Sequence, residues 1–419
     1  MLNLAVIRSQ FPALEKPVVF LDNPGGTQVA RSVVERMTRY LTDSNANHGG
    51  EFETSRISDA IVDEARQRMA DFLNARRTEE IIFGPNMTSL TFQMSRALGK
   101  QLRPGDTIVV TRLDHDANIS PWVKLAEDLR LTIRWVDFHP EDGTLNLEDF
   151  EQAMRERPRL VAFGYASNAL GTVNPVAELV ARAHRVGALT YVDAVQYAPH
   201  GPIDVQTLDV DFLVCSAYKF FGPHVGVLYG KYELLESLPA YKVRPAPEEP
   251  PGKFEMGTGN FEGIAGVLGA LEYLEWMGKT FGGEVEESLP SQFTGRRRYF
   301  KSAMAAIRAY EFSLSRTLLD VLEEIPGIAI YGITDHRRLE ERVPTVSFTL
   351  NGKNPKEVAR MLDERQIQVW NGNFYALAVT QRLGLEESGG LVRVGPVHYN
   401  TIEELERLGR VLWEIAGMQ

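Results

Sequence analysis

The amino-acid sequence predicts an α/β protein with a seven-stranded, mainly parallel sheet, followed by a smaller α+β domain. Three observations support this prediction. The chain has 419 residues, which is enough for roughly two or three domains and a large core. Apolar runs alternate with amphipathic helical stretches as far as residue 229, which is typical of a doubly wound parallel sheet. After about residue 265, long helical stretches replace this alternation.

The predicted strands of the large sheet are short apolar runs. In chain order they are Glu80–Phe83, Thr107–Thr111, Thr132–Phe138, Leu160–Tyr165, Leu189–Val192, Phe212–Cys215 and Val225–Tyr229. The stretches Ile57–Leu73 and Pro175–Val186 are predicted helices, the first because its apolar residues fall on one face. Val225–Tyr229 follows its predecessor after a short Gly-Pro turn. Because that turn leaves no room for a crossover helix, we expect this strand to run antiparallel.

The C-terminal part has fewer strands and longer helices. Its predicted elements are the helices Ile264–Met277 and Tyr299–Glu324, the strand Thr345–Leu350, the helix Pro355–Arg365, the strand Leu391–Val394 and the helix Ile402–Ala416. Thr401 to Glu404 form a capping box that starts the last helix. The polar segment Gly278 to Arg298 is predicted to be an insertion or linker. We expect a large domain over residues 21–265, and a small domain formed by residues 1–20 together with 266–419.

Composition argues against several classes of protein. The formal net charge of -11 leaves no basic footprint for nucleic acid, and Arg296-Arg297-Arg298 is predicted to be a solvated helix face. No segment has the apolar length of a membrane span, and residues 1–8 lack the features of a secretory leader. The single cysteine, Cys215, forms no intrachain disulfide, so we expect a cytoplasmic protein. From the charge and the lack of a long apolar segment, we expect no nucleic-acid and no membrane partners.

Asp193 and Lys219 are the most informative pair of residues. Each follows an apolar run that reads as a buried parallel strand, so both are expected at the same edge of the sheet. Pyridoxal 5'-phosphate (PLP) needs a lysine for its aldehyde and a carboxylate that keeps its pyridine nitrogen protonated. The pair meets both needs, although a surface lysine and a helix-capping aspartate would give the same pattern.

Polar residues also follow the other predicted strands. Thr88 lies at a helix start after the first strand, where a hydroxyl and free backbone N–H groups suit a phosphate, although a plain N-cap looks the same. His115 follows the second strand; it suits stacking on a flat ring, and a solvated loop histidine is an equal alternative. Asn168 and Gln196 follow the fourth and fifth strands, and Ser216 belongs to the sixth strand-end loop. Together these groups are of the kinds that a phosphopyridine requires. No metal site is expected.

Several segments resemble one known family. They are Leu21-Asp22-Asn23-Pro24-Gly25-Gly26-Thr27, Asp114-His115-Asp116-Ala117-Asn118, Ser167 to Pro175, Val192 to Gln196, Ser216-Ala217-Tyr218-Lys219 and Tyr399-Asn400-Thr401. In this order they resemble the class V aminotransferase family of fold-type-I PLP enzymes, and specifically its cysteine desulfurase-like branch. The resemblance implies PLP as cofactor, a small amino acid as substrate, and a homodimer with shared active sites.

The resemblance also implies roles for individual cofactor-binding residues. Lys219 is expected to form the Schiff base, Asp193 to pair with the pyridine nitrogen, and His115 to stack on the ring. Asn168 and Gln196 are expected beside the phenolic oxygen. The phosphate ligands are expected to be Thr88, Ser216 and, across a dimer interface, Thr258, with Met87 and Tyr218 also at the cofactor.

On the substrate side, the resemblance assigns Arg393 to the α-carboxylate. A planar guanidinium that is always charged suits that task. The Pro24-Gly25-Gly26 segment is expected to leave room over the cofactor, and Gly26, His48 and Tyr375 are further candidates for substrate contact. Trp370, Phe374 and Tyr375 suggest an aromatic-lined pocket, and interdomain core is an equal alternative.

Three departures from the desulfurase pattern affect the expected chemistry. Tyr218 stands where desulfurases usually have a histidine, and Met87-Thr88 replaces the usual pair of threonines. The nucleophilic cysteine should lie in the loop Trp370 to Ala376, where Tyr375 falls at or near its position. Cys215 is predicted to be core, inside a strand.

These features lead to a hypothesis about function. We expect a PLP enzyme that cleaves a C–S (or C–Se) bond of a small amino acid by β-elimination, without a persulfide. Epimerisation or racemisation is the first alternative and needs a second acid/base, for which His48, Tyr375 or His115 are candidates. Transamination is a further alternative. A PLP-binding protein without enzymatic activity is disfavoured by the intact lysine, aspartate and arginine. The sequence does not reveal the substrate.

Overall fold

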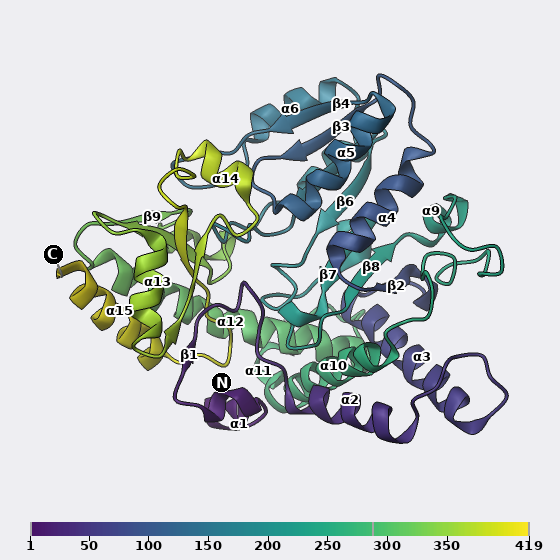
Figure 1. The fold of residues 1–419 in the computed structure, drawn as a ribbon, viewed down its shortest axis with the longest axis horizontal. Coiled ribbons are helices and arrows are strands. Elements are labelled where there is room, and N and C mark those ends of the chain that lie inside the picture. The colour runs from purple at the N-terminus through teal and green to yellow at the C-terminus, as the bar shows by residue number, and fades with distance from the viewer. Residues whose placement is uncertain (1, 287–288, 418–419) are drawn as a thin grey trace.

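The computed structural model describes residues 2–286 and 289–417. Its main feature is the predicted seven-stranded sheet, in which the strands lie in the order β2-β8-β7-β6-β5-β3-β4 (Figure 1). The strands are β2 (Ile81–Gly84), β3 (Thr107–Thr111), β4 (Thr132–Val136), β5 (Leu160–Gly164), β6 (Leu189–Asp193), β7 (Phe212–Ser216) and β8 (Gly226–Gly230). The predicted antiparallel strand is confirmed, since β8 pairs antiparallel with both β7 and β2.

Both faces of this sheet are buried, which explains why its strands are apolar throughout. Alternate residues of one strand enter different apolar clusters: Val161 and Phe163 of β5 belong to one, and Leu160 and Ala162 to another. The first cluster contains helices α3 (Glu53–Leu73), α6 (Leu147–Arg155), α7 (Val176–Arg185) and α10 (Phe261–Phe281). The second contains α4 (Met87–Gly99) and α5 (Ser120–Leu129).

A second, antiparallel sheet of four strands lies beside the first, in the order β12-β13-β10-β9 (Figure 1). Its strands are β9 (Ile328–Tyr331), β10 (Val346–Leu350), β12 (Trp370–Gly372) and β13 (Leu391–Val394). It packs with α13 (Pro355–Asp363) and α15 (Ile402–Gly417) in a third apolar cluster. The predicted capping box is present, since the Glu404 amide donates to Thr401 Oγ1 and the Thr401 amide donates to Glu404 Oε2.

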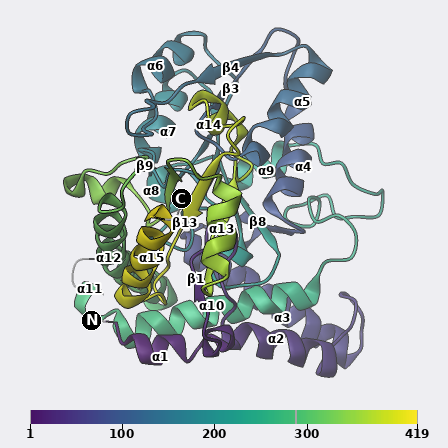
Figure 2. The ribbon, with the colours of Figure 1, turned by 60° about the vertical axis from the view of Figure 1, so that its left-hand side comes forward.

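The two parts are connected by a long helix and by the N-terminal segment. Helix α12 (Gly295–Glu323) contributes Phe300 to the cluster under the large sheet and Leu318 to that of the small sheet. Ile7 and Phe11 pack in the first of these clusters, while strand β1 (Val19–Phe20) pairs in parallel with β11 (Ile367–Gln368). Figure 2 shows α10 and α2 (Arg31–Asp43) side by side beneath the large sheet. The domain boundaries stay a prediction.

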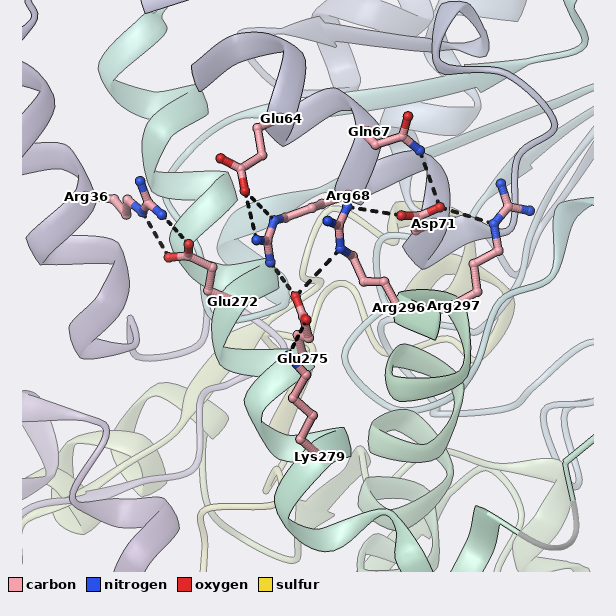
Figure 3. Close-up of polar contacts among 10 residues, drawn as sticks. All are labelled: Arg36, Glu64, Gln67, Arg68, Asp71, Glu272, Glu275, Lys279, Arg296 and Arg297. Atoms are coloured by element: carbon pink, nitrogen blue, oxygen red, sulfur yellow. Dashed lines mark hydrogen bonds and ion pairs between the residues drawn. The ribbon is translucent and has the colours of Figure 1, made fainter. Parts of the chain in front are cut away.

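The predicted linker is wrong over much of its length. Residues 278–281 complete α10, α11 occupies Gly283–Glu286, and α12 already begins at Gly295; residues 287–288 lie outside the described residues. The expected solvated face is also wrong for Arg296 and Arg297. Both pair with Asp71 of α3, at 3.2 and 3.1 Å, and Arg296 also pairs with Glu275 of α10 at 3.7 Å, so polar side chains here join three helices (Figure 3).

The remaining helices are short. They are α1 (Leu4–Arg8), α8 (Val205–Leu208), α9 (Tyr232–Ser237) and α14 (Leu377–Arg382). Across the described parts of the chain, no helix combines the length and the apolar character needed to cross a bilayer.

Candidate active site

A cavity lies at the carboxyl ends of the parallel strands. It is lined by Met87, Thr88, Asp114, His115, Gly164, Ala166, Asn168, Asp193, Val195, Gln196, Tyr218 and Lys219. These residues end or follow β2, β3, β5, β6 and β7. The strand order reverses between β3 and β5, and such a switch point is the usual ligand site of an open α/β sheet.

The β3 and β5 strands separate as they approach the cavity. They pair only at Ile108 with Leu160 and at Val109 with Val161. Beyond that point, Asp114 bridges them: one carboxylate oxygen accepts hydrogen bonds from Thr111 Oγ1 (2.7 Å) and the Gly164 amide (2.9 Å). The opening between the strands is therefore held by a buried carboxylate.

Lys219 and Asp193 both reach this cavity. Lys219 ends a short 3-10 helix (Ala217–Lys219) after β7, and its Nζ donates to the Pro24 carbonyl oxygen. Burial and then the positive charge of Arg393 lower the Lys219 pKa to about 7, although Asp22 and Asp193 oppose the shift. Much of the amine is therefore neutral near neutral pH.

Asp193 ends β6 and keeps a carboxylate in the cavity wall. Burial raises its pKa to about 6, while the Val195 amide, which donates to it at 2.9 Å, and the charge of Lys219 act in the opposite direction. A bound cation such as a protonated pyridine would lower this pKa further. The lysine and the carboxylate thus lie where a PLP molecule would use both.

His115 is neutral in this environment. Its Nδ1 accepts from the Ala117 amide at 3.0 Å, which places the ring proton on Nε2. Burial, and then the charges of Lys219 and Arg393, lower its pKa to about 4. Its ring stacks with that of Tyr375, with centroids 5.6 Å apart and planes at 22°.

Two amide side chains in the cavity wall carry unsatisfied oxygens. Asn168 Nδ2 donates to the Phe374 carbonyl, and Gln196 Nε2 donates to Thr345 Oγ1, each at 2.9 Å. Within residues 2–286 and 289–417, the buried oxygens Asn168 Oδ1 and Gln196 Oε1 have no hydrogen-bond partner. Buried polar atoms normally have one, so a bound polar group is expected beside them.

The start of α4 suits a phosphate. Asn86 caps the helix by accepting from the Ser89 amide, and the Met87 amide donates to Ser216 Oγ at 3.2 Å. Ser216 is buried behind the cavity wall, whereas Met87 and Thr88 line it. The first turn of a long helix presents N–H groups to an anion.

Arg393 lies on β13 of the small sheet and reaches across to the strand-end loops. Its Nη1 donates to the Asn168 carbonyl at 3.0 Å, and its Nη2 pairs with Asp22 at 3.3 Å. The Phe374 ring lies 4.4 Å from the guanidinium carbon. Arg393 is therefore next to the cavity but outside its lining.

Four further candidates also lie outside the lining. Thr258 is exposed just before α10, and His48 is exposed with its ring 5.9 Å from that of Phe261. Tyr375 is 74% exposed. Gly26 lies against Tyr218, since an added Cβ would be 3.3 Å from that ring. In a single chain, the structure does not bring these four into the cavity.

Sequence reasoning missed Asp114 and Asp22 as site residues. Asp114 directly follows a strand, so the strand-end argument that found Asp193 applied to it as well. Burial raises its pKa to about 7 despite its hydrogen bonds from Thr111, Gly164 and Asn118. Asp22 precedes the Pro24-Gly25-Gly26 segment, but no local pattern links it to Arg393.

Cys215 and the loop after β12 lie outside the cavity lining. Cys215 is fully buried in β7, and burial raises the pKa of its thiol. The loop is tied to the large sheet, because the Asp116 amide donates to the Tyr375 carbonyl at 2.6 Å and Asn168 donates to that of Phe374. Phe374 and Tyr375 have φ of 56° and 57°, so two successive residues adopt left-handed backbone.

The donor set fits PLP. The cavity offers a lysine amine, a carboxylate, a neutral aromatic ring, two unsatisfied amide oxygens and a helix start. These match an aldehyde, a pyridine nitrogen, a flat ring, a phenolic oxygen and a phosphate.

Comparisons with known proteins agree with this fit. A sequence profile described as "Aminotransferase class-V" matches residues 19–296 and 297–408. A "Cysteine desulfurase" of Synechococcus elongatus is 33% identical over 430 residues, covering 98% of this chain. The chain spans 63% of the length of that relative. An "Aminotransferase-like protein FGM3" of Gibberella zeae is 34% identical over 417 residues, which cover 96% of each chain.

A solved structure is similar over the whole chain. The apo structure of a cysteine desulfurase from Thermococcus onnurineus NA1 has a TM-score of 0.88 and 29% sequence identity. The alignment covers 100% of this chain and 99% of that one.

Proposed function

The chain belongs to the class V aminotransferase family and is a PLP-dependent enzyme, and from this premise we propose that it cleaves the C–S (or C–Se) bond of a small amino acid. The proposed route is β-elimination without a protein persulfide. Relatives named cysteine desulfurase support the substrate class. The observation that carries the route is the position of the only thiol: Cys215 is buried in β7, and burial raises its pKa. A sulfur acceptor needs an accessible thiolate.

The loop after β12 supports the same conclusion. It carries Tyr375 and no cysteine, and its backbone is hydrogen-bonded to Asp116 and Asn168. In this reading the sulfur leaves as a free thiol and does not pass to the protein.

Each residue of the site has a task in this proposal. When bound, PLP supplies an electron-poor ring that stabilises negative charge on the substrate α-carbon. Arg393 binds the α-carboxylate, Asp193 holds the positive charge of the pyridine nitrogen, and neutral Lys219 takes the α-proton. The Cα–H electron pair forms the second bond between Cα and Cβ as the Cβ–S bond breaks. The thiolate leaves with the electron pair of the Cβ–S bond. Water then converts the enamine product into pyruvate and ammonia.

Epimerisation is the second candidate. The observation in its favour is the Tyr375 ring stacked on His115, which places a hydroxyl-bearing side chain beside a ring that lines the cavity. Epimerisation needs a second proton donor on the face opposite Lys219, and Tyr375 is the candidate for that donor.

The test is an incubation of the purified enzyme with a panel of L- and D-amino acids, including cysteine and selenocysteine. Thiol, pyruvate, alanine and the opposite enantiomer are measured together. We expect pyruvate equal to released thiol, with the same turnover in Cys215→Ser. Alanine as the product, together with a dead Cys215→Ser variant, would contradict the elimination route. Exchange of the α-proton without thiol release would favour epimerisation.

Assembly and location belong to the same proposal. We propose a homodimer with shared active sites, supported by the exposure of Thr258 outside the cavity of its own chain. The proposed location is the cytoplasm, because the sole cysteine is a buried free thiol.

A further inference from the structure

The pair formed by Asp22 and Arg393 is not explained by the proposed chemistry. Asp22 follows β1 and lies beside β13 through a bridge between Asp22 and Gly395. Its Oδ1 is 3.3 Å from Arg393 Nη2. Among the residues that the structure describes, Asp22 is the only carboxylate within ion-pair distance of Arg393. The proposed carboxylate-binding group therefore already holds a carboxylate.

Arg393 is already engaged through two of its nitrogen atoms. Its Nη1 donates to the Asn168 carbonyl, and Phe374 covers its face. Its Nε is buried and has no hydrogen-bond partner among the described residues. Bidentate binding of a substrate carboxylate needs two parallel N–H groups. Nη2 must therefore either release Asp22 or bind Asp22 and the substrate carboxylate at the same time.

We propose that Asp22 is a displaceable counter-ion: it neutralises Arg393 in the substrate-free enzyme and takes up a proton when a substrate carboxylate occupies Arg393. This inference rests on the proposed role of Arg393. It makes Asp22 a specificity-determining residue that couples binding of a carboxylate to uptake of a proton.

The physical reason is that two carboxylates on one buried guanidinium repel each other. Asp22 is faced by Arg393 on β13, by Lys219 after β7 and by Tyr399 after β13. Burial raises the Asp22 pKa, and the charges of Arg393 and Lys219 limit the rise. When a substrate carboxylate takes over Arg393, Asp22 loses its main counter-charge and gains a like charge, and both changes favour its protonated form.

Gly25 provides the room for Asp22 in its present position. A Cβ at residue 25 would lie 2.4 Å from Asp22 Oδ2, so a larger residue there would push the carboxylate away. The Pro24-Gly25-Gly26 segment thus leaves the space in which the Asp22 carboxylate lies.

Because a proton is bound together with the substrate carboxylate, the affinity for a carboxylate should fall as the pH rises.

The experiment measures proton uptake by the holoenzyme. Propionate is the probe, because it has a carboxylate but no amine that reacts with the cofactor. Calorimetric titrations between pH 6 and 9, in buffers of different ionisation enthalpy, give the number of protons bound per propionate. We expect a maximum of about one proton for the wild type. Asp22→Asn should take up none, should bind propionate on the order of tenfold more tightly at the upper end of this range, and should show no pH dependence.

Two variants separate the possible failures. Asp142→Asn removes the carboxylate of an ion pair with Arg338 (2.8 Å) that does not line the cavity, and it should behave as wild type. Arg393→Gln should abolish propionate binding. If Arg393→Gln binds propionate normally, or the wild type does not bind it, the proposed role of Arg393 fails and this inference fails with it. If binding needs Arg393 but no proton is taken up, or if Asp22→Asn binds more weakly, Asp22 only orients Arg393 and the counter-ion proposal is wrong.

Discussion

At the scale of single residues, burial determines the chemistry of the site. Lys219 and Lys301 are both buried, and burial lowers the pKa of each to about 7. Their surroundings differ. Lys301 donates to the carbonyl oxygens of Phe72 and Ile203, inside the apolar cluster beneath the sheet. Lys219 lines the cavity together with Asp193, so it is the lysine with access to a cofactor.

The first prediction concerns the rate at which apo-protein binds PLP covalently. Only a neutral amine attacks the aldehyde, so the rate should fall as the pH drops below about 7 and level off above it. An ordinary lysine would give a rise toward pH ~10. Stopped-flow absorbance between pH 5 and 10 measures the profile. Arg393→Gln should move the midpoint to higher pH, because it removes a positive charge that lowers the Lys219 pKa.

A wild-type rate that climbs without a break to pH 10 would contradict this explanation. So would a midpoint that does not respond to Arg393→Gln. Either result would mean that Lys219 is more exposed to water in solution than the cavity indicates.

Individual residues also show what the sequence could predict of the site. Asp193 and Lys219 were predictable as neighbours, because Asp193 ends one buried strand, Lys219 closely follows the next, and the ends of parallel strands meet at one edge of a sheet. The pair between Asp22 and Arg393 was not, because its members are 371 positions apart in the sequence and no local pattern relates them. The roles assigned to individual site residues stay predictions.

At the scale of elements, the cavity follows from the separation of β3 and β5. The chain crosses over from β4 to β5, which places β5 next to β3. The strands β3 and β5 pair at two positions only. Loops from β3, β5 and β6 therefore open outward at the same place. The strongly apolar strands of this sheet were predictable to within a residue or two, because burial on both faces requires continuous apolar runs.

The elements that sequence analysis missed are short or partly exposed. Strands β1 and β11 have two residues each, and β12 has three, of which Trp370 is 55% exposed. Such segments carry little periodicity. The polar start of α12 was mistaken for a linker because its arginines are paired with residues of other helices, which a single-segment pattern cannot reveal.

The second prediction concerns this ion-pair cluster. Arg68 forms ion pairs with Glu64 and Glu275, and Asp71 forms ion pairs with Arg296 and Arg297 (Figure 3). Asp71→Asn leaves two arginines without their shared counter-charge at a site where the Asp71 side chain is only 12% exposed. We expect the free energy of unfolding to fall by about 1–3 kcal/mol. Denaturant unfolding followed by circular dichroism measures this change.

The control is Glu364→Ala, which removes an exposed pair with Arg360 on α13. Exposed pairs on a helix contribute little, so its unfolding midpoint should stay near that of the wild type. Equal midpoints for Asp71→Asn and Glu364→Ala would show that the cluster does not stabilise the contact between α3 and α12.

At the scale of the whole molecule, the candidate site depends on both sheets. Ser347 of β10 donates to the Ala169 carbonyl at 2.5 Å, and Gln196 donates to Thr345 before β10. Arg393 on β13 bonds to the Asn168 carbonyl. Strand-end loops of the large sheet are thus hydrogen-bonded to the small sheet, which brings the proposed carboxylate site next to the strand-end cavity.

The third prediction concerns assembly. Thr258 is exposed and lies outside the cavity of its own chain, so we expect it to reach the phosphate bound by a second copy in a C2 dimer. Thr258→Ala should then lose one hydrogen bond of about 1 kcal/mol, which corresponds to about fivefold weaker PLP retention. Visible absorbance after extended dialysis measures the retained cofactor. Thr132→Ala, at an exposed position of β4, is the matched control.

Sedimentation velocity provides the independent check. A wild-type monomer that keeps PLP fully would contradict the shared site. Equal PLP retention by the Thr258 and Thr132 variants in a stable dimer would leave the dimer but remove Thr258 from the phosphate.

The central claim is that the strand-end cavity is the PLP site and that Lys219 carries the cofactor. Reduction of the PLP-bound enzyme with borohydride, followed by peptide mapping, tests this claim most directly. We predict one phosphopyridoxyl label per chain, on Lys219, and none in Lys219→Ala. Lys301 is the built-in comparison, because it is equally buried and has a similarly lowered pKa. A label on Lys301, or on any lysine other than Lys219, would contradict the account.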